Sequence, residues 1–320
     1  MESSIKLQVA ELKHSEPITQ SQIEMAKETE NKDLNREVVT RAVKKLIENP
    51  VYGFYLVSLD KEAVAASLMI TYEYNYIKDI TIFWFQSVYV YKDYRMKGLF
   101  KNMYQYVYNK AKAEKAHSLR LYVDLDNKDA MSVYSKMGMS DTGESLFEVD
   151  LAFDPTKKIE FEKGYTGLSD ASEYRIRKFT LEDLKNLNLE EFTSILDEDK
   201  DVSKAQAGVL LSLKGDRSSE VWLLVNKEKI VGVLSVFYEF SDWRDSVMFW
   251  VNDLRIRNGI EKEQQEHTAL TFKLYYDMIL AQNALVLRFI LGKPQIWVKS
   301  LLTNCGVPES HYRIYEQIIS

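Results

Sequence analysis

The strongest constraint on the fold of this 320-residue chain is an internal repeat. Glu73 corresponds to Glu239, and Phe83–Trp84 corresponds to Phe249–Trp250 at the same separation, with no gap between these positions. A charged Lys-Glu turn also recurs in each copy. Chance matches apolar strand positions more readily than it matches charged turns and strands together, so the sequence predicts two tandem copies of one fold.

The order of the expected elements indicates the class of that fold. Apolar residues recur at three-to-four spacing between residues 34 and 47, which predicts a helix that ends at Asn49–Pro50. Segments rich in β-formers predict strands on both sides of further helices. The expected strands cover residues 6–12, 54–59, 63–72, 80–90, 119–123 and 145–151, and later helices cover 98–112 and 128–137. This mixed order predicts an α/β (α+β) fold in which helices flank each sheet.

The chain length fits two domains of ordinary size. A polar stretch that begins at Asp154-Pro155 contains two glycines within residues 154–167, which makes it the best linker candidate. We therefore expect a first domain at residues 1–153, a linker at 154–170 and a second domain at 171–320.

Composition limits the partners of the chain. The formal net charge of −6 argues against nucleic acid, because nucleic-acid binders usually carry a basic excess, and it suits a cationic or amine substrate. The N-terminus lacks the pattern of a secretory signal, and the most apolar stretch, residues 80–91, is shorter than the roughly 20 residues that span a bilayer. The single cysteine, Cys305, fits a reducing compartment. We expect a cytoplasmic protein without a membrane partner.

The segment Arg95-Met96-Lys97-Gly98-Leu99-Phe100 is the first candidate site. It follows the expected strand 80–90 and opens a helix, so free backbone N–H groups and the positive end of the helix dipole offer a site for phosphate. Arg95, Lys97 and Lys101 add charged donors beside it. Gly98 lets the backbone approach an anion closely.

At this segment the chain resembles the GNAT superfamily of N-acetyltransferases. The superfamily marks its acetyl-CoA site with Arg/Gln-x-x-Gly-x-Gly/Ala, and this chain has Arg95-x-x-Gly98-x-Phe100, so Phe100 replaces a small residue. Downstream, the strand and helix that contain Asn127 and Tyr134 resemble the superfamily's Asn-x-x-Ala-x-x-x-Tyr-x-x-x-Gly pattern. The resemblance covers residues 1–151 and implies two tandem domains, each with a mixed, mostly antiparallel sheet.

The resemblance also implies a mechanism, in which an amine attacks the thioester of acetyl-CoA directly. Backbone N–H groups at Ser87–Val90, where the superfamily has a bulge, would polarise the carbonyl, and Tyr134 would protonate the CoA thiolate. Glu73 is the candidate base. The expected contacts to acetyl-CoA, the only co-substrate, are Val88, Tyr89, Val90, Arg95, Met96, Lys97, Gly98, Leu99, Phe100, Lys101 and Asn127.

Each of these residues also has a structural interpretation. Asn127 can serve only as a helix N-cap, and Tyr134 can pack under the sheet. Glu73 can be structural, since its counterpart Glu239 lies in the second copy. The four histidines show no metal-ligand spacing, so we expect no metal site.

The second copy is expected to lack acetyl-CoA binding. At the same separation, the turn aligns with Glu261–Glu266, whose carboxylates would repel a pyrophosphate, and the tyrosine position falls near Val298–Leu302, which has no phenol. Phe240–Arg244 resembles superfamily members around a strand turn. We expect this copy to form a wall of the substrate cleft or an internal, dimer-like partner.

Three functions remain open at this point. The first is an N-acetyltransferase that acts on a small-molecule or peptide amine. The second is a non-catalytic acyl-CoA-binding or regulatory protein, for which Met96 and Phe100 would mark a decayed turn. The third is a tandem acyltransferase that joins an amino acid to an amine.

Overall fold

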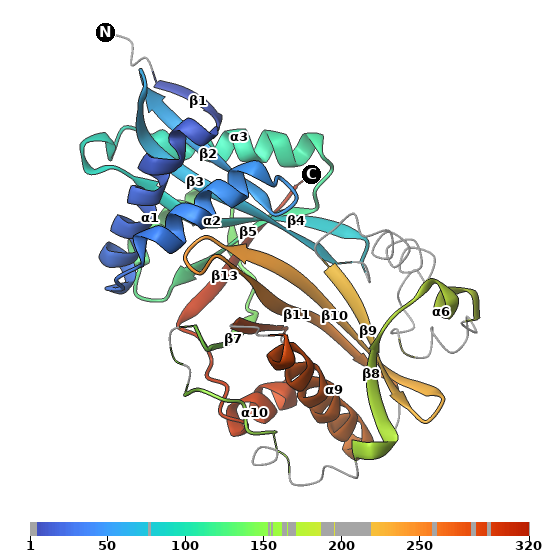
Figure 1. Ribbon diagram of the computed structural model, residues 1–320. Helices are drawn as coiled ribbons and strands as arrows, with labels where there is room; N and C mark the ends of the chain where they lie inside the picture. The colour runs from blue at the N-terminus through green and yellow to red at the C-terminus, as the bar shows by residue number, and fades with distance from the viewer. Residues whose placement is uncertain are drawn as a thin grey trace.

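The computed structural model describes residues 5–75, 78–152, 154, 156–161, 165, 171–186, 195, 219–257, 261–282, 286–292 and 296–319. Within these residues the chain forms two sheets flanked by helices (Figure 1). The first half contains β1 (Ile5–Val9), α1 (Ser15–Glu30), α2 (Arg36–Glu48), β2 (Gly53–Asp60), β3 (Ala63–Asn75), β4 (Ile80–Val90), α3 (Leu99–Ala113), β5 (Ser118–Asp124), α4 (Lys128–Lys136), β6 (Ser140–Asp141) and β7 (Ser145–Asp150). The second half contains β8 (Tyr174–Lys178), α6 (Leu181–Asn186), β9 (Ser219–Asn226), β10 (Lys229–Ser241), β11 (Ser246–Ile256), α9 (Glu261–Ala281), β12 (Val286–Leu291), α10 (Ile296–Asn304) and β13 (Tyr312–Ile318).

The structure confirms the internal repeat. Strands β2, β3 and β4 begin and end at the positions that the repeat assigns to β9, β10 and β11. The turns repeat as well: Lys61 and Lys227 have φ of 56° and 54°, and Asp79 and Asp245 have φ of 51° and 48°. Each sheet is mixed and mostly antiparallel, with one parallel pair among the described strands, β4 with β5 and β11 with β12. The predicted fold class is therefore correct.

Helices cover both faces of the first sheet. The side chain of Asn35 accepts hydrogen bonds from two N–H groups of the first turn of α2, which explains where this helix begins. Val39 and Val43 of α2 pack in one buried cluster with Tyr55 and Val57 of β2. On the opposite face, α3 packs against β2–β5 in a second cluster that includes Met103. Alternate residues of one strand thus enter two different cores.

The two halves exchange their last strands. The first sheet has the order β1-β2-β3-β4-β5-β13-β6, and the second has the order β7-β12-β11-β10-β9-β8. Strand β13 pairs antiparallel with β5 along its whole length, and β7 pairs with β12 in the same way (Figure 1). The domain boundaries proposed from the sequence thus separate the two copies of the repeat, but each sheet contains a strand from the other copy. Most of the proposed linker, residues 154–170, lies outside the described residues.

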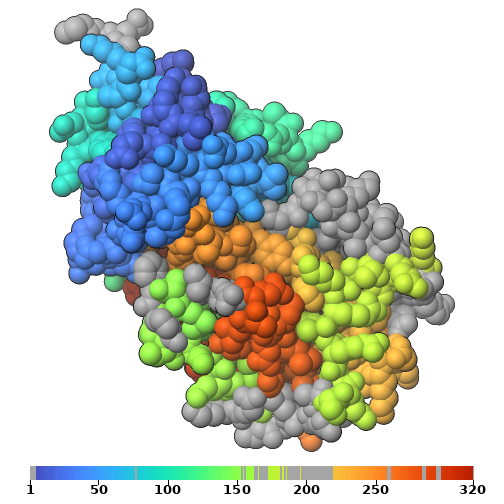
Figure 2. Space-filling view, viewed as in Figure 1, coloured from blue at the N-terminus to red at the C-terminus, as the bar shows by residue number. Residues whose placement is uncertain are grey.

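The halves also meet through β3 and β10. On the neighbouring strands β4 and β11, the indole rings of Trp84 and Trp250 lie 5.6 Å apart. The Trp84 Nε1–H donates to Glu73 at 2.8 Å, and the Trp250 Nε1–H donates to Glu239 at 3.0 Å. Figure 2 shows the β10–β11 hairpin, in orange, directly below the blue helices α1 and α2. This packing agrees with the expected internal partner.

Among the described residues, none of the helices has the length and apolar character needed to cross a bilayer.

Candidate functional site

Strands β4 and β5 diverge in the middle of the first sheet. They pair in parallel only from Ile82–Phe85 to Ser118–Leu121, although both strands continue further. The β3–β4 register also shifts by one residue between Phe85 and Val88, which places a β-bulge at Gln86–Ser87. Among the described residues, β5 gives β4 no ladder partner beyond the bulge, so the backbone groups of β4 on this side have no strand to pair with. The bulge expected in this strand is thus present.

The turn after β4 is shaped as an anion site. Gly98 lies in the left-handed region with φ of 74°, and a Cβ there would meet no atom within 4 Å. The first helical bond of α3 runs from the Asn102 N–H to the Gly98 carbonyl at 3.2 Å, so the N–H groups of residues 99–101 have no partner inside the helix. Met96 is fully exposed, and Lys97 and Lys101 are exposed beside it.

Arg95 does not aim a free guanidinium at this turn. Its Nη1 and Nη2 each donate to a Glu28 carboxylate oxygen of α1 at 2.8 Å, and its Nε donates to the Val90 carbonyl at 2.9 Å. The Arg95 charge lowers the pKa of the Glu28 carboxyl through these bonds. Arg95 therefore ties the turn to α1, which corrects the expectation of a direct phosphate contact in this conformation.

Phe100 packs inward from the turn. Its ring lies 5.9 Å from the Tyr134 ring and 6.1 Å from the Tyr104 ring. The neighbouring Leu99 is buried. The large residue at the superfamily's small position thus fills space between α3 and α4 and leaves the backbone at Gly98 open.

Tyr134 and Asn127 line a cavity of about 290 Å³ at the point where β4 and β5 diverge. The Asn127 side chain accepts the Ala130 N–H at 3.0 Å, so it caps α4 and lines the cavity as well. Burial raises the pKa of Tyr134 to about 12. Val88 lines the same cavity, whereas Tyr89 is buried and its hydroxyl donates to Glu24 at 2.7 Å.

The second half forms the opposite wall of this cavity. The expected segment Phe240–Arg244 lies there with Met248 and Arg288, facing Glu148 of the exchanged strand β7. No sequence motif marked Glu148 or Arg288, since the exchange of β7 brings Glu148 beside Arg288 of β12. The remaining wall residues are Met25, Thr29, Glu30, Lys32, Met69, Phe85, Gln86, Ser87, Leu121, Tyr122, Val123, Asp124 and Tyr312.

Glu73 does not line this cavity, so the geometry gives no support to its expected role as the base. The residue is 2% exposed and lies in the interface between the halves. Beside the Trp84 bond, its carboxylate accepts the Asn252 Nδ2–H at 2.8 Å. Burial raises the pKa of Glu73, while the charge of Arg120 opposes that rise. The carboxylate is thus held by partners from both halves.

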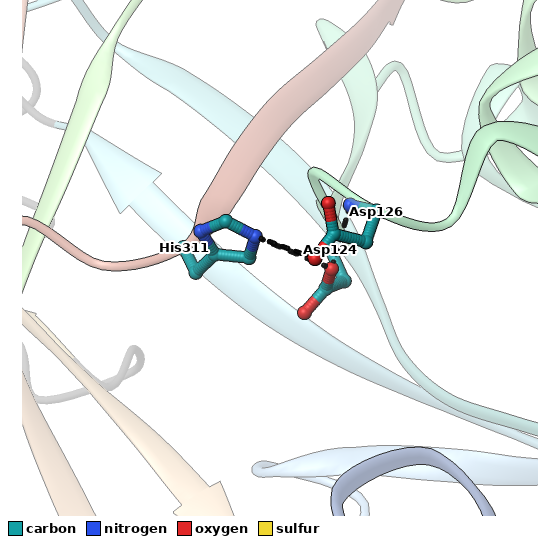
Figure 3. A group of neighbouring side chains, drawn as sticks. All are labelled: Asp124, Asp126 and His311. Carbon is teal, nitrogen blue, oxygen red and sulfur yellow. Dashed lines mark hydrogen bonds and ion pairs between the residues drawn. The ribbon is translucent and has the colours of Figure 1, made fainter.

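One group of side chains brings possible metal-ligand atoms together within the described residues. Asp124, Asp126 and His311 approach one another where β5 ends and β13 begins (Figure 3), and His311 Nε2 lies 3.2 Å from Asp126 Oδ2. Sequence spacing could not show this group, because the exchange of β13 supplies the histidine. The three side chains are largely exposed. Exposed acidic groups are common without a metal ion, and here the two carboxylates lie near the His311 imidazole.

Comparisons with known proteins agree with this geometry. Residues 17–139 match the acetyltransferase (GNAT) family. A possible acetyltransferase from Clostridium difficile 630 is 34% identical over 42% of this chain and 89% of that one, with a TM-score of 0.40. No curated protein matches the chain.

Two solved structures share the fold over almost the whole chain. A GCN5-related N-acetyltransferase from Sphaerobacter thermophilus has a TM-score of 0.57 and 12% identity, over 98% of this chain and 96% of that one. A tandem GNAT protein from the clavulanic acid biosynthesis pathway has a TM-score of 0.54 and 11% identity, over 99% of both chains. The family match in the first half and the tandem fold of the whole show that this chain belongs to the GNAT superfamily of acetyltransferases.

Proposed function

We propose that this chain is an N-acetyltransferase that moves the acetyl group of acetyl-CoA directly to a primary amine. One observation carries the proposal: the β4 bulge and the Tyr134 phenol lie where β4 and β5 diverge, and Phe100 of the first turn of α3 packs against Tyr134. A cytoplasmic location, expected from the single and buried Cys305, belongs to the same proposal.

The first half would hold acetyl-CoA in an extended path. The N–H groups of Leu99, Phe100 and Lys101 would bind the pyrophosphate, with Lys97 adding charge. The pantetheine arm would run along the free edge of β4, from Ser87 to Val90. This edge supplies the amide partners that an extended, amide-containing arm requires.

The chemistry would take place beside the bulge. Backbone N–H groups there would polarise the thioester carbonyl as the amine attacks it. The Tyr134 phenol carries its proton at neutral pH, as any phenol with a pKa of about 10 or above does, so a proton is present there for the departing thiolate. Metal chemistry is not required for this transfer.

The charges of the cavity support an amine acceptor. Each cation in the wall already has a carboxylate partner: Lys32 pairs with Glu30, Arg244 with Asp150, and Arg288 with Glu148. Among the residues that the structure describes, Asp242 forms no such pair. The uncompensated charge is therefore negative, which attracts an ammonium group.

The second half is proposed to bind no acetyl-CoA. Leu302, fully buried, holds the place in α10 that Tyr134 holds in α4. The expected alignment of the phosphate turn with Glu261–Glu266 needs correction, because Glu261 already begins α9 and these residues form its first turns. Two of its acids, Glu261 and Glu263, still lie where a phosphate would bind. Isothermal titration of the whole chain should give one site per chain, and two sites would refute this.

A thiol-release assay tests the main proposal. Acetyl-CoA is incubated with 1,4-diaminobutane, spermidine, glucosamine and glycinamide, and release of CoA is followed. Tyr134→Phe should lower kcat on the order of 10²-fold or more, the usual contribution of an acid–base group, with unchanged acetyl-CoA affinity. Unchanged turnover would remove Tyr134 from the mechanism. Coenzyme binding without any transfer would favour the non-catalytic alternative, for which Arg95 bound to Glu28 is the supporting observation.

A further inference from the structure

The turn between β10 and β11 is held over the cavity by two anchors. Trp243 Nε1–H donates to Gln22 of α1 at 3.1 Å, and Arg244 pairs with Asp150 of β7. These contacts fix the residue that precedes them in the turn and lies on the cavity side. That residue is Asp242, which is 6% exposed and lines the cavity.

Asp242 lies against the bulge of the other half. Its Oδ2 accepts a hydrogen bond from the Tyr55 hydroxyl of β2 and lies 3.5 Å from the Ser87 hydroxyl of β4. Ser87 belongs to the bulge beside which the thioester would lie. A carboxylate of the second half is thus placed at the reacting end of the proposed coenzyme path in the first half.

The other carboxylates of the cavity are already engaged. Glu148 pairs with Arg288, and Glu30 accepts from Lys32 at 2.6 Å. Asp124 lies 3.8 Å from His311 at the end of β5. Among the described residues, Asp242 forms no ion pair with a lysine, arginine or histidine. It is therefore the carboxylate of this wall that is available to a substrate cation.

We propose that Asp242 is the general base that deprotonates the acceptor amine, so that the second half completes the active site of the first. This inference rests on the proposed acetyltransferase function. It replaces Glu73 with a residue that lines the cavity.

The proposed step balances as follows. The ammonium gives one proton to Asp242, and the nitrogen lone pair then forms the C–N bond to the thioester carbon while the carbonyl electron pair moves to oxygen. That pair returns, the C–S bond breaks, and the CoA thiolate takes the proton of Tyr134. The proton still in excess on nitrogen returns to the tyrosinate, and Asp242 releases its proton to water. One ammonium and one acetyl-CoA thus give one amide, one CoA thiol and one proton.

The electrostatic surroundings suit this role. Burial raises the pKa of Asp242 to about 6, while hydrogen bonds from Tyr55 and Ser87 and the charge of Arg244 favour the carboxylate. These groups face Asp242 from β2, from β4 and from its own turn. At neutral pH Asp242 is a carboxylate whose pKa lies near the working pH, as an effective base requires.

The test compares the whole chain with Asp242→Asn and with Asp245→Asn as a matched control. Asp245 lies in the same turn but pairs with Arg41 and Lys45 on the outer side, and it is absent from the cavity wall. Steady-state rates with acetyl-CoA and the best amine of the panel are measured from pH 5 to pH 9. Acetyl-CoA affinity is measured by isothermal titration for each chain.

Asp242→Asn should lower kcat on the order of 10²–10⁴-fold at pH 7 without changing acetyl-CoA affinity, and its deficit should shrink at high pH, where free amine is abundant. The unmodified chain should lose activity as pH falls below about 6, and Asp245→Asn should follow it. A wild-type profile without this acidic limb overturns the inference even if Asp242→Asn fails to fold.

Other outcomes separate this inference from the proposed function. A deficit that is equal at every pH, or one shared by Asp245→Asn, would make Asp242 merely structural. An active chain whose Asp242→Asn variant keeps its rate overturns the base assignment alone. A wild-type chain that transfers to no amine overturns the proposed function and the base with it.

Discussion

Replacement of Arg288 by methionine should strongly destabilise the fold. Arg288 of β12 lies directly opposite Glu148 of the exchanged strand β7 and pairs with it. Its Nη1 is 3.6 Å from Glu239, and its guanidinium lies 4.8 Å from the centre of the Trp250 ring. One buried cation thus compensates two carboxylates and fixes the strand that the first half contributes to the second sheet.

The magnitude follows from which charges remain. Arg288→Met keeps most of the side-chain volume but leaves Glu239, whose side chain is fully buried, and Glu148 without their cation. Removing one partner of a buried ion pair costs about 3–5 kcal/mol. We expect this loss of unfolding free energy at pH 8.

The loss should depend on pH in a definite direction. In the native chain Arg288 holds the pKa of Glu148 below its usual value although burial acts to raise it, and burial raises the pKa of Glu239 to about 7. Arg288 lowers both of these pKa values, so both should rise in the folded state when Arg288 is removed. An acid whose pKa is raised by folding contributes stability at low pH and loses it as pH rises through the folded value. The difference between the two chains should therefore be smaller at pH 5 than at pH 8.

Urea unfolding followed by tryptophan fluorescence measures this difference at both pH values, with the m-value as a check on two-state behaviour. Arg41→Met is the matched control, because Arg41 also pairs across the halves but is 62% exposed and should cost about 1 kcal/mol or less. The reasoning is refuted if Arg288→Met costs no more than Arg41→Met, or if its cost is the same at pH 5 and pH 8.

Three further substitutions test local features. Gly53→Ala should destabilise the chain far more than Gly98→Ala, because a Cβ at Gly53 would lie 1.9 Å from the Ile70 carbonyl oxygen. A Cβ at Gly98 would meet open space, so Gly98→Ala should cost only about 1–2 kcal/mol, for its left-handed backbone. Equal urea midpoints for the two variants would contradict this. Trp84→Phe keeps a ring but removes the donor to buried Glu73, so we expect a loss of about 1–3 kcal/mol by the same method. The Trp84→Phe loss should nearly vanish in a Glu73→Leu background, which has no oxygen to accept the indole N–H, if this bond is its cause.

The sequence predicted the features that depend on local patterns. The repeat predicted the matched strands because turn residues and strand residues recur together, and the left-handed turns at Lys61 and Lys227 show why the charged turn was informative. The helix start at Gly98 and the cap at Asn127 also follow from neighbouring residues. Such features need no knowledge of distant contacts.

The features that the sequence missed depend on pairing between distant segments. Nothing in the residues of β7 or β13 selects the sheet that each strand joins. Glu73, the candidate base, is buried between the halves, where it accepts a hydrogen bond from Asn252, a partner that its own strand could not predict. Arg95 was expected to contact phosphate because it lies in the turn before a helix. Its partner Glu28 lies in α1, far earlier in the sequence, so the sequence did not show that Arg95 forms an ion pair.

The two copies share the contacts that join the halves. Arg120 pairs with Glu316 of β13, as Arg288 pairs with Glu148 of β7, and each cation lies over the tryptophan of its own half. The contacts that hold the halves together therefore occur twice.

The residues proposed for chemistry occur once each. The Tyr134 phenol has Leu302 in its place in the second half. Asp242 corresponds in the repeat to Tyr76, which lies outside the described residues. An ancestral pair of equal sites would need both groups in both halves, whereas a single site at the junction needs one acid from the first half and one base from the second. On this argument the duplication contributes a second wall for one active site, and the proposed loss of coenzyme binding in the second half is compatible with its proposed role in catalysis.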